Sequence, residues 1–349
     1  MKIRNTFIST VALASALFFS GCGNEASTPS QTKAQAPQKI EKAEAIQKVQ
    51  KAETRDDIRI FAANNSDGKI TKDSIEDAFK ANGFIITGNN NMNQAFEGRF
   101  GEKFPTAGKD YHTYRLMFVY NADIITKLIK DYPRAGLLAP LSTSVYSKDG
   151  KTVNISSLTL EGMSRITGIP ADNADLIALS DNMKKAIAQA LPNGAFKELS
   201  YKKVRPDGEI VTRFKFQLNR DSDDIEEDKE AYQEMMEGEI ESNGFIVAGF
   251  TAVNEDLVDN DIETYDFYDT YSICKLEVIY PVHKTHPEVG ALAPCTMYMY
   301  KKTDEKFTYM GYPSVYNWIM TTNIEDDYSL NPLIDAQNSL EFTIDGTIE

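Results

Sequence analysis

Two stretches of the sequence share one shape and decide the fold. Residues 291–302 read ALAPCTMYMYKK, and residues 137–148 read LLAPLSTSVYSK, with leucine in the earlier copy where the later copy has Cys295. Each stretch predicts a strand, at about 137–147 and 291–301. Successive strand residues point to opposite faces, so Cys295 and the two methionines share one face and Tyr298 and Tyr300 share the other.

Other blocks recur in the same order, which indicates an internal duplication. The matching blocks are NGFIITG at 82–88 with NGFIVAG at 243–249, residues 111–120 with residues 271–280, and residues 132–136 with residues 286–290. In this alignment the second copy is shorter between its last two blocks. The first copy has room there for a helical turn or two that the second copy lacks.

The two copies predict an α+β fold of two tandem domains, at residues 56–203 and 204–349. Each domain has the order strand, helix, four strands, helix, and forms an antiparallel sheet with helices on one face. Residues 195–218 predict a hairpin around Pro206-Asp207-Gly208, whose second arm opens the second domain. The expected strands are near 58–63, 113–120, 137–147, 152–159, 271–280, 291–301 and 306–312, with a short strand directly after the glycine of each Asn-Gly-Phe. The expected helices are 72–82, 174–191, 224–243 and 314–338, the last broken by Pro332.

The motif order resembles a known bacterial family. Each copy has an Asn-Gly-Phe after a helix, then a strand that ends in tyrosine, then a Pro and a Gly before the motif LLAPL of the first copy or ALAPC of the second. This order resembles the family catalogued as domain of unknown function 302. Both copies carry the motifs, so the resemblance covers about residues 56–345. It implies a fold similar to that of the TATA-binding protein and implies no catalytic residue, since the family has no established activity. Leu141 departs from the pattern, which often has cysteine there.

The N-terminus predicts a lipid-anchored, secreted precursor. Lys2 and Arg4 precede an apolar run at residues 7–19, which is too short to span a bilayer but suits a signal peptide. The run ends in Phe-Ser-Gly before Cys22, which resembles the lipobox of bacterial lipoproteins. The resemblance implies cleavage after residue 21 and acylation of Cys22, the palmitate anchor. Residues 22–55 have few large apolar side chains and predict a flexible tether.

Charge and hydropathy limit the partners. The formal net charge is −15, and an acidic surface repels nucleic acid, so we expect no nucleic-acid partner. No segment after the signal peptide is apolar enough to cross a membrane. We therefore expect the lipid to anchor the chain to the cell membrane or the outer membrane, with the folded part facing the periplasm.

The remaining cysteines admit three interpretations. Cys274 and Cys295 lie on apolar strand faces. Their equivalents in the first copy are Tyr114 and Leu141, which have no thiol, so the default interpretation is that both cysteines are buried scaffold residues. A disulfide between them is an alternative in an oxidising compartment. A catalytic thiol assisted by His283 or His286 is the third.

The histidines predict no metal site. His283 and His286 are three residues apart in a loop, without enough further ligands nearby, and His112 stands alone, so packing or solvated roles are expected. No cofactor motif is found either.

These patterns favour a non-enzymatic binding module of the cell envelope. We expect a small apolar ligand or an envelope protein to bind in a groove of the sheet or between the domains. A thiol enzyme or redox protein using Cys295 and Cys274, or a purely structural envelope protein, are the alternatives.

Overall fold

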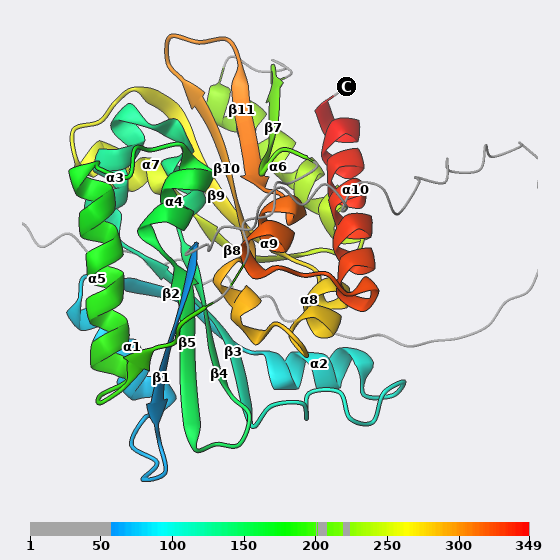
Figure 1. The fold of residues 1–349 in the computed structure, drawn as a ribbon. Helices are drawn as coiled ribbons and strands as arrows, with labels where there is room; N and C mark the ends of the chain where they lie inside the picture. The colour runs from blue at the N-terminus through cyan, green and yellow to red at the C-terminus, as the bar shows by residue number, and fades with distance from the viewer. Residues whose placement is uncertain (1–56, 200, 202–207, 219–223, 349) are drawn as a thin grey trace, which may run out of the picture. The chain divides into compact units, whose positions relative to one another are not determined.

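The computed structural model describes residues 57–199, 201, 208–218 and 224–348. The predicted signal peptide at 1–21, the lipidation site Cys22, the tether at 22–55 and the boundary between residues 203 and 204 lie outside these residues. The described part is a mixed α+β structure with two antiparallel sheets (Figure 1). Below, "first half" means residues 57–199 and "second half" means residues 208–348.

The first half forms a six-stranded sheet in the order β2-β3-β4-β5-β1-β6. The strands are β1 (Ile58–Asn64), β2 (Ile85–Asn91), β3 (Thr113–Tyr120), β4 (Leu141–Ser147), β5 (Thr152–Leu158) and β6 (Ala195–Phe196). Its helices are α1 (Lys72–Ala81), α2 (Met92–Phe100), α3 (Ala122–Asp131), α4 (Leu160–Thr167) and α5 (Ala174–Ala190), with a 3₁₀ segment η1 (Pro133–Leu138). Helices α1 and α3 both pack against α5.

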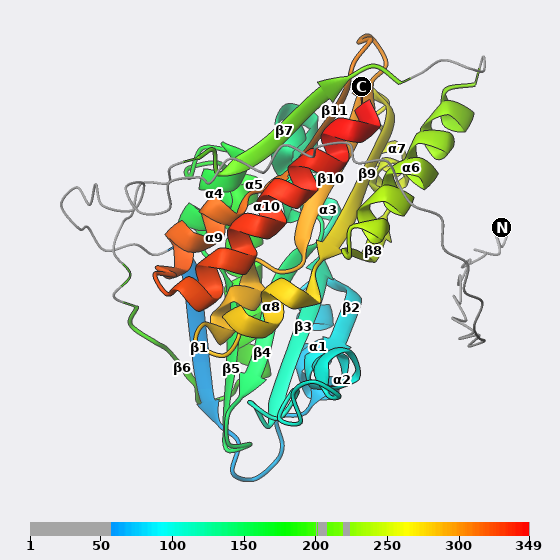
Figure 2. The ribbon, with the colours of Figure 1, turned by 90° about the vertical axis from the view of Figure 1, so that its right-hand side faces the viewer.

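The second half forms a five-stranded sheet in the order β7-β11-β10-β9-β8. The strands are β7 (Val211–Phe216), β8 (Ile246–Thr251), β9 (Tyr265–Cys274), β10 (Cys295–Lys302) and β11 (Thr308–Pro313). Its helices are α6 (Ile225–Ser242), α7 (Val253–Asp259), α8 (Leu276–Val282), α9 (Val315–Thr322) and α10 (Asp327–Ile348), with a 3₁₀ segment η2 (Pro287–Ala291). Helix α10 runs along one face of this sheet (Figure 2), where it contacts α6, α8, α9 and β7.

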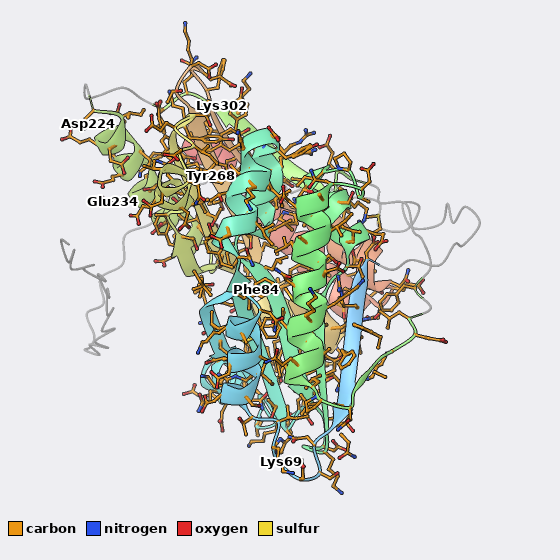
Figure 3. All side chains as sticks on the ribbon, turned by 90° about the vertical axis from the view of Figure 1, so that its left-hand side faces the viewer. Lys69, Phe84, Asp224, Glu234, Tyr268 and Lys302 are labelled. Atoms are coloured by element: carbon orange, nitrogen blue, oxygen red, sulfur yellow. The ribbon has the colours of Figure 1, made fainter. Side chains whose placement is uncertain are left out.

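Local sequence accounts for the helix ends. Thr71 caps α1 through a reciprocal pair of hydrogen bonds with Ser74, which satisfies amide groups that a helix start leaves without partners. Gly83 and Gly244 follow α1 and α6 with φ of 82° and 80°, a backbone region that glycine enters without steric cost. Both helices therefore end at the Asn-Gly pair where the sequence predicted their ends. Asp224, the N-cap of α6, and Glu234 within α6 are acidic and face solvent (Figure 3).

The expected strand at 271–280 is wrong. Strand β9 ends at Cys274, and the residues after it form α8. Residues 275–278 alternate polar and apolar side chains, and Val, Ile and Tyr follow at 278–280, so the segment has the local pattern of a strand. It is a helix because α8 packs against α10 and α2. Local pattern was overridden by tertiary contacts.

Strand register also corrects the alignment of the two halves. Ile85 pairs with Tyr120 in the first sheet, and Ile246 pairs with Cys274 in the second. Cys274 therefore holds the sheet position of Tyr120, rather than that of Tyr114. With this register the same number of residues separates Tyr120 from η1 and Cys274 from η2, so the expected gap in the second half disappears, and α3 and α8 occupy the same place in the order of elements.

Two further expectations need correction. The arms of the predicted hairpin at 195–218 lie in different sheets, because β6 pairs with β1 while β7 pairs with β11. Each arm finds a sheet edge, which the turn sequence alone does not reveal. The helix expected at 314–338 is two helices, and the break between them falls after Asn323, in left-handed conformation, while Pro332 lies inside α10.

The two halves interlock through their 3₁₀ segments. Segment η1 lies on β9, β10 and β11 of the second sheet, and η2 lies on β4 and β5 of the first. Ser142 donates a hydrogen bond to the carbonyl of Pro294 at 3.0 Å, and Thr296 donates one to the carbonyl of Pro140 at 2.8 Å. Each sheet therefore binds the segment that precedes the other half's proline-led strand.

Candidate functional site

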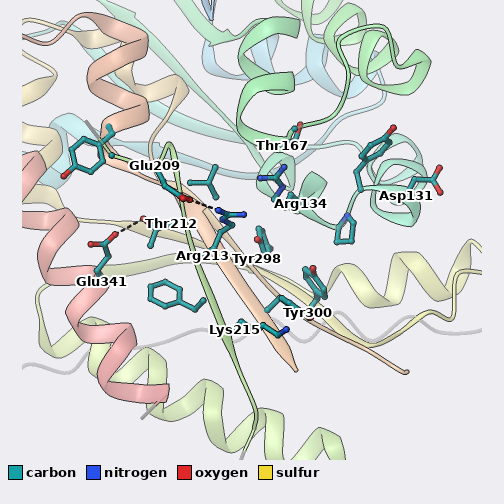
Figure 4. Close-up of a pocket in the computed structure, with 18 residues that line it drawn as sticks. Asp131, Arg134, Thr167, Glu209, Thr212, Arg213, Lys215, Tyr298, Tyr300 and Glu341 are labelled. Carbon is teal, nitrogen blue, oxygen red and sulfur yellow. Dashed lines mark hydrogen bonds and ion pairs between the residues drawn. The ribbon is translucent and has the colours of Figure 1, made fainter. Parts of the chain in front are cut away.

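A cleft of about 910 Å³ lies where η1 and α4 of the first half meet β7, β10 and β11 of the second (Figure 4). Its size is within the usual range for small-molecule sites. The side chains that define it are Arg134, Arg213, Lys215, Tyr298, Tyr300 and Tyr309. Residues from both halves are needed to form it.

Stacked tyrosines make the floor of the cleft. The ring of Tyr300 stacks on Tyr309 with centroids 5.2 Å apart, and on Tyr268 with centroids 5.3 Å apart. The ring of Tyr298 lies 5.6 Å from that of Tyr300. Because Tyr298 and Tyr300 are two residues apart in β10, strand alternation puts both rings on the face away from α10.

Tyr298 brings a hydroxyl group to this floor. The next strand has Gly311 beside it, and a Cβ there would lie 2.7 Å from the Tyr298 hydroxyl, so only glycine leaves room for the ring. Tyr298 is nearly fully buried, and its hydroxyl has no hydrogen-bond partner among the described residues. Burial raises the pKa of Tyr298 to about 12, against the opposing effect of the Arg134 and Arg213 charges. The hydroxyl is thus a neutral donor at neutral pH.

Arg134 enters the cleft from η1, which the second sheet holds in place. Tyr268 donates its hydroxyl hydrogen to the carbonyl of Pro133 and accepts the amide hydrogen of Gly136 at 3.1 Å. The guanidinium of Arg134 lies against Gly168, where any side chain would overlap it. No carboxylate of the described residues pairs with Arg134, so its charge is available to a ligand.

Arg213 and Lys215 enter from the opposite side, along β7. They are two residues apart and exposed, so they share the cleft face of the strand. Arg213 pairs with Glu209 at 2.7 Å, and both side chains are largely exposed. The ammonium of Lys215 lies 4.1 Å from the ring centroid of Phe307, a cation–π contact. Figure 4 shows Arg134 and Arg213 projecting toward the space above Tyr298.

Carboxylates also border the cleft. Glu341 accepts hydrogen bonds from Thr212 at 3.0 Å and from Gln337 at 2.7 Å, which hold it on the α10 side of β7. Asp131 is exposed at the end of α3. None of the described lining residues is a serine, cysteine or histidine.

The two cysteines predicted as a site lie together elsewhere. Cys274 and Cys295 line a cavity of about 50 Å³ between the second sheet and α8, α9 and α10, beside Trp318. Both are free thiols here, and the disulfide stays a prediction. Burial raises the pKa of each thiol to about 12, so little thiolate forms at neutral pH.

The histidines are not joined to these thiols by any described hydrogen bond. His283 is buried, its Nδ1 donates to the carbonyl of Tyr280 at 2.6 Å, and its ring lies 4.5 Å from that of Phe96. Burial lowers the pKa of His283 to about 4. His286 contacts Glu288 at 3.2 Å, and His112 is exposed beside Thr113. The catalytic pairing of a thiol with either loop histidine thus gains no geometric support.

The described residues contain neither a metal-binding cluster nor a membrane-spanning helix. No group of three or more His, Cys, Asp or Glu side chains within residues 57–348, apart from the gaps named above, is arranged to hold a metal ion. No described helix is both long and apolar enough to cross a bilayer.

The arginines of the cleft were not predicted from the sequence. A signal for part of the site existed, because TMYMYKK places two tyrosines on one strand face and VTRFKF places two cations on one face. The sequence does not show that Arg134, far away in the chain, comes to the same place. That juxtaposition depends on the packing of η1 on the second sheet.

Comparison with known proteins supports the family resemblance over part of the chain. The model of a family described as domain of unknown function DUF302 matches residues 64–190. Among solved structures, the chain is similar to the uncharacterized conserved protein DUF302 from Bacillus stearothermophilus, at 16% identity over 41% of this chain and 100% of that chain, with a TM-score of 0.34. No curated protein matches the chain.

Proposed function

We propose that this protein is a membrane-anchored, periplasm-facing binding module, and that the cleft between its two halves binds a small ligand. One observation carries the proposal. The cleft of about 910 Å³ has a built floor of stacked tyrosines and walls from both halves. Concave sites of this size with a few converging polar groups are the usual places where small molecules bind.

The nature of the lining refines the expected ligand. The apolar cavity beside Cys274 and Cys295 has only about 50 Å³, which is much less than a ligand of ordinary size needs. The open cleft combines aromatic rings with arginines, so a wholly apolar ligand would leave the guanidinium groups without acceptors. A ligand with both an apolar and a polar part fits better.

A binding role also agrees better with the thiols than an enzymatic role does. A nucleophilic cysteine needs a lowered pKa, whereas burial raises the pKa of Cys274 and Cys295 to about 12. Their place between the sheet and its helices suits scaffold residues.

The tandem repeat is part of the proposal. The shared strand order β2-β3-β4-β5-β1 and β8-β9-β10-β11-β7 supports a duplicated domain. The reciprocal hydrogen bonds of Ser142 and Thr296 support it further, because an interface that joins two copies of one domain uses the same contact twice. The cleft would then arise from the contact between the copies.

Co-purification tests the binding role. The full chain is purified from its native membrane with detergent and examined by untargeted mass spectrometry for small molecules. Tyr309→Ala removes part of the cleft floor, and Tyr328→Ala removes a tyrosine that is 57% exposed outside the cleft. We expect a small molecule to accompany the wild type and Tyr328→Ala, and to be depleted in Tyr309→Ala. Equal amounts in all three proteins, or none in the wild type, would contradict a ligand-binding cleft.

A further inference from the structure

We infer that the cleft recognises an oxyanion, a carboxylate or phosphate group of its ligand, held by Arg134, Arg213 and the hydroxyl of Tyr298. This inference rests on the proposed function and names the chemical class of the ligand. Three cations and three carboxylates line the cleft, and the site would be formed by the two arginines that face Tyr298.

Arg134 has a charge that is free to bind an anion. It is partly buried at the cleft wall, and no carboxylate of the described residues neutralises it. A cation that is half removed from water without a counter-ion is unfavourable unless a ligand supplies one. The Tyr268 contacts with Pro133 and Gly136 fix η1, so Arg134 is presented by a rigid element.

Tyr298 offers a hydroxyl donor to the same anion. Its hydroxyl lies in the cleft floor, has no partner within the described part of the chain, and stays protonated at neutral pH. The hydroxyl opens into the cleft, so it can donate to a ligand, and an oxyanion is the strongest acceptor a ligand offers. Arg134, Arg213 and Tyr298 line the same cleft, and Figure 4 shows both arginines beside Tyr298, so the three donors can serve one ligand group.

Arg213 can serve the same anion. Its partner Glu209 has a side chain that is 72% exposed, and exposed ion pairs contribute little stability. An anion that enters the cleft can therefore take a share of the Arg213 hydrogen bonds at small cost. The guanidinium donates in a planar fork, which suits a carboxylate or a phosphate.

The surrounding acidic charge does not prevent binding. At physiological ionic strength, exposed charges more than about 8 Å apart are largely screened. Glu341 is engaged with Thr212 and Gln337 on the far side of β7. The tyrosine rings beside the arginines offer an apolar surface, so an oxyanion attached to a ring or short apolar body fits the cleft.

Calorimetry with five probes tests the inference on the full chain in detergent. The probes are phenyl phosphate, benzoate, inorganic phosphate, benzyl alcohol and benzylammonium. We expect phenyl phosphate and benzoate to bind, inorganic phosphate to bind more weakly, and the neutral and cationic probes to show no binding. The stronger of the first two probes identifies whether phosphate or carboxylate is preferred.

Variants assign the binding to the cleft. Arg134→Gln and Arg213→Gln should each weaken binding of the anionic probes at least tenfold, Tyr298→Phe should weaken it severalfold, and Arg134→Lys should fall between Gln and wild type. Arg99→Gln is the matched control, because Arg99 is 56% exposed and paired with Glu277 at 2.6 Å, much as Arg213 is with Glu209. Circular dichroism and thermal unfolding check that each variant is folded.

The outcomes separate the two proposals. Anion binding that survives both glutamine variants overturns the oxyanion site. Tighter binding of benzyl alcohol than of benzoate also overturns the oxyanion site, but it leaves the proposed binding role of the cleft intact. If none of the five probes binds, the oxyanion site is also overturned, and the binding role is then judged by co-purification alone. A loss in Arg99→Gln equal to that in Arg213→Gln would show a general charge effect and would count against the site.

Discussion

The hydroxyl of Tyr268, in the second half, accepts the amide hydrogen of Gly136, in the first half, at 3.1 Å. The same hydroxyl donates to the carbonyl of Pro133, so one side chain from β9 holds both ends of the first turn of η1. Because Arg134 lies between Pro133 and Gly136, this contact also sets one wall of the cleft. Stability of the interface and geometry of the site are therefore linked.

Gly136→Ala should destabilise the protein by about 1–3 kcal/mol, since a methyl group there would overlap the Tyr268 hydroxyl and force the packed elements apart. Urea unfolding measures the change. Gly238→Ala in α6 is the control, because no atom lies within 4 Å of its added Cβ, and it should gain about 0.5–1 kcal/mol from helix propensity. A Gly136→Ala variant as stable as wild type would mean that η1 is not closely packed on Tyr268.

His283 predicts a pH dependence of stability. Burial lowers its pKa to about 4 from an ordinary 6.5, so the folded protein binds this proton less readily than the unfolded chain does. The stabilising contribution is complete above pH 6.5 and is lost as the pH falls toward 4, by about 3 kcal/mol in total. The measurement is urea unfolding at several pH values for wild type and His283→Gln.

The difference between the two proteins reports His283 together with its contact to Asp110, whose carboxylate lies 3.8 Å from the His283 Nε2. Asp269 acts in the opposite direction, because burial raises its pKa to about 6 and its contribution is lost as the pH rises from its ordinary range through 6. Asp269 is present in both proteins and cancels in the difference. A wild-type advantage that stays constant from pH 7 to pH 4 would argue that His283 is accessible to protons in the folded state.

Cys295→Ala should lower the free energy of unfolding by about 1–2 kcal/mol if the thiol is free, because it removes apolar contacts beside Trp318. If Cys295 is bonded to Cys274, the loss should be near 3 kcal/mol and reductant should destabilise the wild type similarly. Unfolding of both proteins with and without reductant distinguishes these cases. Native Cys295 should react slowly with iodoacetamide. Rapid alkylation together with four equal midpoints would reopen the thiol-enzyme alternative.

Cys22→Ser should abolish acylation and leave the protein unanchored or unprocessed. Cys22 lies outside the described residues, so this prediction rests on the lipobox resemblance alone. Fractionation with a high-salt wash, followed by blotting, measures it, and the wild type serves as the retained control. A variant that stays in the washed membrane fraction would contradict a lipid anchor at this residue.

The sequence by itself determined most of the local structure. It predicted α1 and α6 with their Asn-Gly ends, strands β1, β3, β4, β5, β10 and β11, helix α5, and the alternation that puts Tyr298 opposite Cys295. These features depend on neighbouring residues, through capping, left-handed glycine and side-chain period, so a short window contains the cause.

Tertiary structure decided the rest. Residues 276–282 are a helix because α10 and α2 pack against them, and β6 and β7 separate because each pairs with a different sheet edge. The cleft needs Arg134 and Arg213 together, and only the placing of η1 on the second sheet by Tyr268 brings them there. Such contacts join residues distant in the chain, and their free energy depends on the whole fold, which no local pattern of residues contains.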